Sequence, residues 1–414
     1  MYCCHQEPAT LHLRANGLVL ISEAQAADGS SCVIVGSREG CCSTPLLHIE
    51  AAQCTLSNLH IEHAFCVASC RPRELGTNDS ELGQFSAIRI SGESQALIAR
   101  CSISCRQGCG IDVGGSARPT IHNCSVEACS DGFILRDSSA VTVRQSSVRN
   151  CTSSCIKSIN HAEGTVHDNT FENGGHACLL AAGRSSTSFI NNKIGDTKGC
   201  GIRLCDETTA LVEGNHVNGH HMNGLEAGGS SNAMVKGNTI KGSSGSGMVL
   251  HDSCNGVFVN NDISGSVFAG VGIQDRADPI FTGNRVSHGA GSGLVLLDEA
   301  KGVIDDNRFF KNTCAGIGIK GNACGLFNKN TVCDNEGYGV WMQDTASSTF
   351  QNNLVENNSK AGFAVSHQAA PTLHSNRIIG GQQVGFFYLT LSLDVCVCMC
   401  VYVCACLCLC LSRV

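Results

Sequence analysis

The residues best placed to do chemistry are aspartates that recur in steps of 23 residues or multiples of 23. They are Asp137, Asp206, Asp252, Asp275, Asp298 and Asp344. Asp252, Asp275 and Asp298 are consecutive, and if the repeats stack as strands, neighbouring carboxylates lie about 5 Å apart. Such a row could do acid/base chemistry on a glycosidic bond or bind calcium. Elsewhere the same position holds Asn160, Gly183, Gly229 and Gly321. Exchange of Asp, Asn and Gly is typical of a turn with positive φ, so the sequence favours a structural turn.

Three histidines and one acidic pair are the other candidates for chemistry. His216, His220 and His221 lie close together and could bind a metal or transfer a proton. No matching acidic or histidine cluster occurs one repeat away, so they are interpreted as loop residues. The pair Asp305-Asp306 occurs in one repeat only and is weak evidence for hydrolysis. The sequence therefore predicts no metal site and no cofactor.

The elements that would position these residues follow a 23-residue repeat. Asparagine occupies one position of it without a miss, at Asn169, Asn192, Asn215, Asn238, Asn261, Asn284, Asn307, Asn330, Asn353 and Asn376. Glycine occupies a second position in phase, at Gly201, Gly224, Gly247, Gly270, Gly293, Gly316, Gly339, Gly362 and Gly385. A fixed period of this size predicts a solenoid. A catalytic residue is needed once, so the asparagines are interpreted as an interior ladder of amides that hydrogen-bond from coil to coil.

Each repeat has the pattern of three short strands. Counted from Gly270, apolar residues fall at plus one and plus three (Val271 and Ile273), a second strand follows Pro279, and a third apolar residue is Val286. This alternation indicates half-buried strands, and no window has helical spacing. The plus-eleven position forms an apolar column of Phe189, Val212, Val235, Phe258, Phe281, Ile304, Phe327, Phe350 and Leu373. The sequence thus predicts an all-β chain, a parallel β-helix of about 13 coils.

The repeat also predicts the domain organisation. Residues 1–45 are expected to form an N-terminal cap and an irregular first coil, and residues 46–388 the β-helix. Residues 66–84 break the period and are rich in turn formers, which predicts an inserted loop. Residues 389–414 alternate Cys with Val and Leu and are expected to be disordered or a gene-model artefact. The alternative interpretations of this tail are a short membrane span, an added strand, or a soft-metal site, although the cysteines lack the paired spacing of zinc modules.

Composition restricts the partners and the compartment. The net charge is -7, and the 28 Lys and Arg residues form no basic run, so nucleic acid is not an expected partner. Many of the 29 cysteines follow the repeat as small apolar residues, for example Cys155 and Cys178. The first residues do not show the pattern of a signal peptide, so the expected location is intracellular, cytoplasmic or nuclear, and reducing. No membrane association is expected unless the tail is real.

An outward stripe is the best candidate for a binding face. The plus-two position should point to solvent, yet it holds Val249, Gly272, Val295, Gly318, Trp341, Ala364 and Phe387. Trp341 is the only tryptophan. Lys320 and Gln343, at plus four, flank the stripe. Apolar and small residues on an exposed face would let a flat ligand or an extended peptide approach. The alternative is an ordinary half-apolar sheet surface.

The repeats AGVGIQDRADPIFTGNRV and YGVWMQDTASSTFQNNLVENN resemble those of right-handed parallel β-helices. Similar repeats occur in F-box β-helix proteins and in carbohydrate-binding proteins and sugar hydrolases, and the resemblance covers about residues 87–388. The F-box relatives imply recruitment of substrates to a ubiquitin ligase, but residues 1–45 do not look like an F-box. The polygalacturonase motif set is matched only by Asp305-Asp306. The alginate epimerase signature is absent, since Ile280-Phe281 follow Asp278-Pro279.

The function predicted from the sequence is a non-catalytic binding scaffold of the substrate-receptor type for protein partners. Its expected contact residues are Val249, Val295, Lys320, Trp341, Gln343 and Phe387. The alternative is a carbohydrate-active hydrolase, lyase or epimerase that uses Asp252, Asp275 and Asp298, in which case carbohydrate is the ligand. A structural rod or a fragment without its own activity is a third hypothesis.

Overall fold

The computed structural model describes residues 11–21, 32–38, 45–65, 85–381 and 386–389, and every regular element in them is a β-strand. None of these residues belongs to a helix that could span a membrane. The predicted inserted loop, 66–84, and all but the first residue of the predicted tail, 389–414, lie outside the described residues. The chain divides into two compact units, residues 1–221 and residues 222–414.

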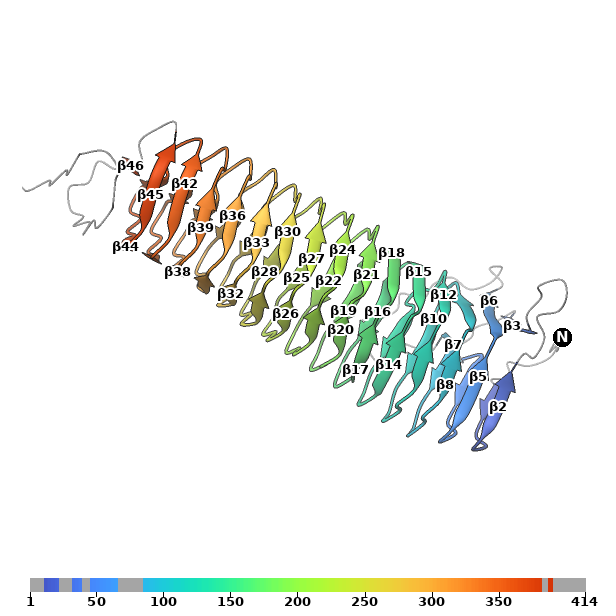
Figure 1. The fold of residues 1–414 in the computed structure, drawn as a ribbon. Coiled ribbons are helices and arrows are strands. Elements are labelled where there is room, and N and C mark those ends of the chain that lie inside the picture. The colour runs from blue at the N-terminus through green and yellow to red at the C-terminus, as the bar shows by residue number, and fades with distance from the viewer. Residues whose placement is uncertain (1–10, 22–31, 39–44, 66–84, 382–385, 390–414) are drawn as a thin grey trace, which may run out of the picture. The chain divides into compact units, whose positions relative to one another are not determined.

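The first unit contains strands β1 to β24 in three parallel sheets, A, B and C (Figure 1). Sheet A holds, in stacking order, β1 (Leu11–Leu13), β4 (Leu47–Ile49), β7 (Ser86–Ile90), β10 (Cys109–Val113), β13 (Phe133–Leu135), β16 (Ser154–Ser158), β19 (Ala177–Ala181) and β22 (Cys200–Leu204). Sheet B holds β2 (Leu18–Ile21), β5 (Cys54–Ser57), β8 (Leu97–Ala99), β11 (Thr120–His122), β14 (Ala140–Arg144), β17 (Glu163–His167), β20 (Ser188–Ile190) and β23 (Leu211–Glu213). Sheet C holds β3 (Cys32–Arg38), β6 (Leu59–Phe65), β9 (Ser102–Cys105), β12 (Ser125–Glu127), β15 (Ser147–Cys151), β18 (Thr170–Gly174), β21 (Lys193–Gly195) and β24 (His216–Asn218).

The second unit repeats this arrangement with strands β25 to β46. Its sheet A holds β25 (Leu225–Ala227), β28 (Met248–Leu250), β31 (Val271–Ile273), β34 (Leu294–Leu296), β37 (Ile317–Ile319), β40 (Val340–Met342), β43 (Phe363–Ser366) and β46 (Phe386–Leu389). Its sheet B holds β26 (Met234–Lys236), β29 (Val257–Val259), β32 (Ile280–Thr282), β35 (Val303–Asp305), β38 (Leu326–Asn328), β41 (Thr349–Gln351) and β44 (Thr372–His374). Its sheet C holds β27 (Thr239–Lys241), β30 (Asp262–Ser264), β33 (Arg285–Ser287), β36 (Arg308–Phe310), β39 (Thr331–Cys333), β42 (Leu354–Asn358) and β45 (Arg377–Gly381).

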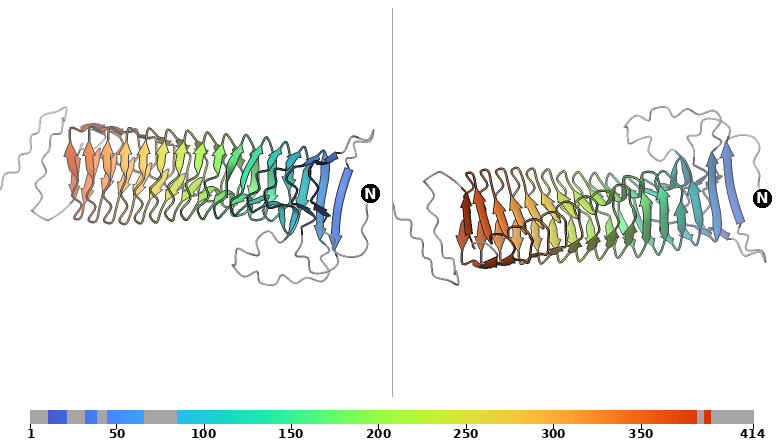
Figure 2. Two further views of the ribbon diagram at one scale, coloured as in Figure 1. Left: turned by 90° about the horizontal axis from the view of Figure 1, so that it is seen from below. Right: turned by 90° about the horizontal axis from the view of Figure 1, so that it is seen from above.

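Each strand pairs in parallel with the equivalent strand of the next coil, as both views of Figure 2 show within each unit. In the second unit, Val271 pairs with Leu294 and Ile273 with Leu296. In the first, Leu11 pairs with Leu47, so strand pairing begins within residues 1–45, the region predicted as a cap and an irregular first coil. The fold is an all-β, right-handed parallel β-helix with about 23 residues per turn, and each turn adds one strand to each sheet, giving 15 strands in each of sheets B and C among the described residues. The fold prediction is therefore confirmed.

The predicted apolar column is the core of each unit. Phe189 and Val212 are fully buried in the first unit, and Phe258 and Phe281 in the second. Stacking of equivalent residues brings the rings of Phe327 and Phe350 to 4.5 Å between centroids with an interplanar angle of 9°. Burial of a Phe side chain contributes about 2–3 kcal/mol, so this column supplies much of the stability that one coil lacks by itself.

The asparagine ladder is interior, as predicted, and its amides take part in three kinds of hydrogen bond. Asn284 donates from Nδ2 to the carbonyl oxygen of Phe258 at 2.9 Å and to Oδ1 of Asn307 at 3.0 Å. Its own Oδ1 accepts from the backbone N–H of Asn261 at 2.8 Å. The same pattern joins Asn169 to Asn192 in the first unit. The ladder therefore satisfies backbone groups at a bend where no sheet partner exists.

Candidate functional site

The aspartate row occupies a left-handed turn. Asp252, Asp275 and Asp298 have φ values of 56°, 57° and 59°, and Asn160 and Gly183, in the equivalent position of the first unit, have 60° and 69°. Residues other than Gly, Asn and Asp rarely adopt this conformation. The turn interpretation drawn from the exchange of Asp, Asn and Gly is thus confirmed.

Each aspartate of the row also caps the turn of the preceding coil. Oδ2 of Asp252 accepts from the backbone N–H of Gly229 at 2.8 Å, and the N–H of Asp252 donates to Oδ2 of Asp275 at 3.0 Å. The N–H of Asp275 donates to Oδ2 of Asp298 at 3.3 Å. The hydrogen bond from Gly229 holds the pKa of the Asp252 carboxyl below its ordinary value. An ionised acceptor stabilises a turn well but is a poor general acid at neutral pH.

One member of the row has partners suited to chemistry. His251 lies between two carboxylates, with Nδ1 2.9 Å from Oδ2 of Asp252 and Nε2 3.6 Å from Oε1 of Glu226. Its ring occupies the space above Gly228, where a Cβ would lie 2.2 Å from Cε1 of the ring. Any larger residue at 228 would displace the imidazole. Sequence reasoning missed this grouping because it depends on a side chain that reaches back to the preceding coil.

Two groups of side chains in the described residues could hold a metal ion. His251, Asp252 and Asp275 place one donor atom each within 4.8 Å of one another, and so do His12, His48 and Glu50 in the first unit. Nitrogen and carboxylate donors suit a divalent transition metal. The Asp252 and Asp275 carboxylates already accept backbone hydrogen bonds, which leaves one oxygen of each for an ion.

The predicted binding stripe lies on the outer face of sheet A. Val249 and Val295 are half-buried, as are Trp341, Gln343 and Lys320. For Phe387 the structure gives only the backbone of β46, where it pairs with Ala364, and its side chain lies outside the described part.

The stripe has an aromatic centre that the sequence revealed only in part. The Tyr338 and Trp341 rings lie 6.2 Å apart between centroids, tilted by 33°. Nζ of Lys320 lies 4.8 Å from the Trp341 ring centroid, and Nζ of Lys360 lies 5.1 Å from that of Tyr338. Beside Trp341 in the preceding coil is Gly318, where an added Cβ would meet nothing closer than 4.0 Å. Below, these four side chains and Gly318 are called the aromatic platform. Tyr338 was missed because its repeat position holds no aromatic residue in the neighbouring coils, where it is Ser292, Ala315 and Ala361.

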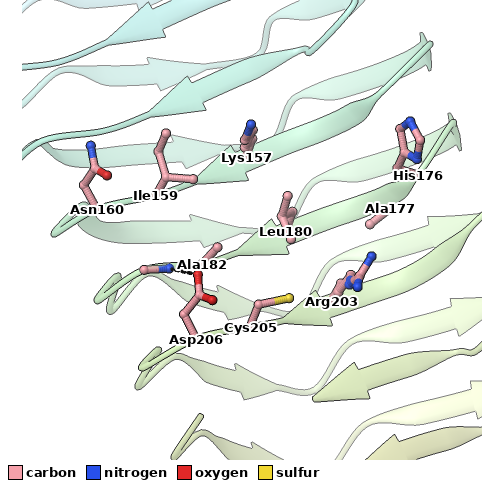
Figure 3. Close-up of a pocket in the computed structure, with 11 residues that line it drawn as sticks. Lys157, Ile159, Asn160, His176, Ala177, Leu180, Ala182, Arg203, Cys205 and Asp206 are labelled. Carbon is pink, nitrogen blue, oxygen red and sulfur yellow. Dashed lines mark hydrogen bonds between the residues drawn. The ribbon is translucent and has the colours of Figure 1, made fainter. Parts of the chain in front are cut away.

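A cavity of about 350 Å³ lies on the outer face of sheet A in the first unit. Figure 3 shows Lys157, Leu180 and Arg203 on three successive strands of its wall, with His176 at one end and Asp206 at the other. None of the predicted contact residues and none of Asp252, Asp275 and Asp298 lines it, although Asp206, at the same repeat position as that row, does. Its position could not be read from the sequence, because its lining residues come from three successive coils.

Of the three clustered histidines, only His220 is buried. His216 and His221 are exposed, as expected for loop residues, whereas His220 is 1% exposed and neither ring nitrogen has a hydrogen-bond partner among the described residues. Burial lowers the pKa of His220 to about 4. The folded state therefore holds this imidazole neutral.

We expect the first unit to lose about 2 kcal/mol of stability between pH 7 and pH 5 through His220. In the unfolded chain the imidazole takes up a proton near its ordinary pKa of 6.5, while in the folded chain it does so only near pH 4. Stability is thus complete above pH 6.5 and is lost as the pH falls. Urea denaturation monitored by circular dichroism would measure this. His220→Leu should remove this part of the pH dependence, and His221→Gln should retain it; a change of equal size in both variants would contradict the assignment.

These features define a class: a parallel β-helix with an interior asparagine ladder, capped turns and an aromatic outer face. The family model described as a right-handed beta helix region matches residues 43–194, 177–325 and 304–393, and the chain belongs to this family. The comparison with curated proteins gave no match.

Among solved structures, a mutant of the periplasmic alginate epimerase AlgG is similar with 10% identity and a TM-score of 0.49 over 74% of this chain and 77% of that one. The A-module of a mannuronan C-5 epimerase from Azotobacter vinelandii has 12% identity and a TM-score of 0.37, with 86% of each chain covered. The tailspike protein of E. coli bacteriophage HK620, in complex with a pentasaccharide, has 11% identity and a TM-score of 0.44 over 90% of this chain and 72% of that one. We base no functional assignment on these similarities. Neither they nor the family match supports an F-box or a role in the ubiquitin pathway.

Proposed function

We propose that this chain is a non-catalytic binding scaffold and that its partner lies on the outer face of sheet A in the second unit, across the aromatic platform. The observation that carries this proposal is the pair Tyr338 and Trp341, held in place by a lysine from the coil on either side. Ordered aromatic rings lose little conformational entropy when they are buried against a partner. Tryptophan and tyrosine are also the residues that dominate binding energy at protein interfaces.

The surroundings of Trp341 favour close approach of a partner. Gly318 places no side chain beside the indole, and the half-buried Val295 continues the apolar surface one coil further. Gln343 and Lys320 border the platform with polar groups. A small apolar centre with a polar margin is the usual anatomy of a protein interface. Protein is therefore the partner class that we favour, without a specific link to ubiquitin ligation.

The test compares partner binding by the full wild-type chain with binding by two variants, Trp341→Ala and the matched control Phe268→Ala. Phe268 belongs to the same unit and is 66% exposed, so it controls for loss of any surface aromatic ring. A partner would first be captured with the wild-type chain, then purified and titrated against each variant. We expect Trp341→Ala to lower the affinity for this partner by roughly tenfold or more. Phe268→Ala should bind like wild type. Equal binding by all three chains would refute the contact face, and binding only to a glycan array would show that the partner is carbohydrate.

A second candidate function is a carbohydrate-active enzyme built on the aspartate row. The specific observation in its favour is His251, which two carboxylates, Glu226 and Asp252, orient on an accessible face. If this candidate is right, Asp275→Asn combined with Asp298→Asn should abolish turnover of a polysaccharide substrate, while Trp341→Ala should leave kcat unchanged. Against it stands the capping role of each carboxylate in the row.

A further inference from the structure

Two arginines lie side by side on the outer face of sheet C in the second unit. Arg285 opens β33 and Arg308 opens β36, and the two are direct partners in the parallel register. Both side chains are exposed. Equivalent residues of neighbouring coils are about 4.8 Å apart at the backbone, so two like charges are held close together. Like charges directly opposite each other on a sheet destabilise it, which makes the pair a cost to the fold.

A single aromatic ring orders both guanidinium groups. Cζ of Arg308 lies 4.6 Å and Cζ of Arg285 5.2 Å from the ring centroid of Phe310. His288 packs edge-on against the same ring at 5.8 Å. Phe310 alternates with the inward-facing Phe309 and so belongs to the outer face, yet it is only 7% exposed. Both guanidinium groups therefore lie within cation–π distance of Phe310 while their side chains stay exposed to solvent.

These N–H groups lack an acidic partner among the described residues. Neither guanidinium forms an ion pair there, although Asp262 is the register neighbour of Arg285 on the other side. The one hydrogen bond found is from Nη2 of Arg308 to Sγ of Cys333 at 3.8 Å, and a thiol sulfur is a weak acceptor. Each guanidinium keeps a fork of donors that suits the paired oxygens of an oxyanion.

We propose that Arg285 and Arg308 form a binding site for a tetrahedral oxyanion, sulfate or phosphate, free or as an ester on a larger ligand. Each guanidinium presents paired N–H donors, and a tetrahedral oxyanion has enough oxygens to accept from both groups at once. A carboxylate can also bridge two arginines, as Asp112 does between Arg89 and Arg136, but it offers only two oxygens to these donors. An anion between the arginines would also offset the repulsion of the like charges. This site lies on sheet C and does not depend on the function proposed for sheet A.

The test is calorimetric titration of the full chain with sodium sulfate and sodium phosphate at constant ionic strength. We expect saturable binding to the wild type, at least tenfold weaker binding to Arg285→Gln or Arg308→Gln, and none to the double variant. Arg276→Gln is the matched control, because Arg276 is an exposed arginine of the same unit without an aromatic partner among the described residues. It should bind within twofold of wild type. Phe310→Leu keeps both charges but loses the ring, and should weaken binding several-fold.

Two results would overturn the proposal. One is an equal loss of affinity in Arg276→Gln, which would show that only net charge matters; the other is unchanged or absent binding across the whole series.

Methyl sulfate and methyl phosphate distinguish the two sources of the anion. Tighter binding of the esters than of the inorganic ions would assign the site to a group on a larger ligand. Tighter binding of the inorganic ions would assign it to the free anion.

Discussion

Asn284→Ala is expected to lower the free energy of unfolding of the second unit by about 3–5 kcal/mol. The amide of Asn284 is 1% exposed. Its removal leaves the N–H of Asn261 without its acceptor and takes one donor each from the carbonyl of Phe258 and from Oδ1 of Asn307, which still accepts from the backbone N–H of residue 284. Each buried polar group without a partner costs about 1–3 kcal/mol. Partial compensation within the ladder keeps the total below the simple sum.

Urea denaturation followed by Trp341 fluorescence measures this effect. Trp341 is the only tryptophan and belongs to the second unit, so its emission reports on the unit that carries the substitution. Asn255→Ala is the control, because Asn255 is exposed on the same unit. It should change stability by less than about 0.5 kcal/mol. A loss below about 1 kcal/mol for Asn284→Ala would show that the ladder contributes little.

Gly270→Ala is expected to destabilise the same unit by about 3 kcal/mol, whereas Gly272→Ala, two residues away, should be neutral or slightly stabilising. A Cβ at 270 would lie 2.2 Å from Cγ1 of Val286 and 2.7 Å from the carbonyl oxygen of Gly293. That oxygen accepts from the N–H of Val271 at 2.8 Å and cannot move without breaking the sheet. A Cβ at 272 would meet nothing within 4 Å.

The same fluorescence-monitored denaturation compares the two glycine variants. Because both replace glycine by alanine in one coil, they have the same effect on the entropy of the unfolded chain. The difference in free energy of unfolding between the two variants therefore measures the cost of the steric clash at position 270. Equal stability of the two variants would show that Val286 and the neighbouring backbone can adjust, and that the glycine column has another cause.

Much of the fold could be predicted from the sequence, because stacking demands the same residue type at the same position of every coil. The asparagines around Asn284 and the apolar column through Phe281 satisfy that demand and are interior. A second ladder, formed by Asn312, Asn335 and Asn358 on the sheet C side, was missed although these residues also lie 23 apart. It has only three members, since the same position holds other residue types in the remaining coils.

The site was less predictable for a geometric reason. The outward direction of Trp341 follows from strand alternation, but the lysines that hold Tyr338 and Trp341 come from neighbouring coils. The row containing Asp275 was recognised as a turn, whereas its capping of the preceding turn was not predicted. Such contacts depend on which way a side chain leans along the stacking direction, and a linear pattern does not contain that information.

The sequence by itself determined the period, the three strands per coil, the interior columns and the positive φ of the aspartate turn. These depend on alternation and on backbone sterics, both of which are local. Only the tertiary structure decided that His251 reaches back over Gly228 and that Phe310, an outward residue, is buried beneath Arg285 and Arg308. Those arrangements join side chains from different coils, so they exist only when the coils are stacked.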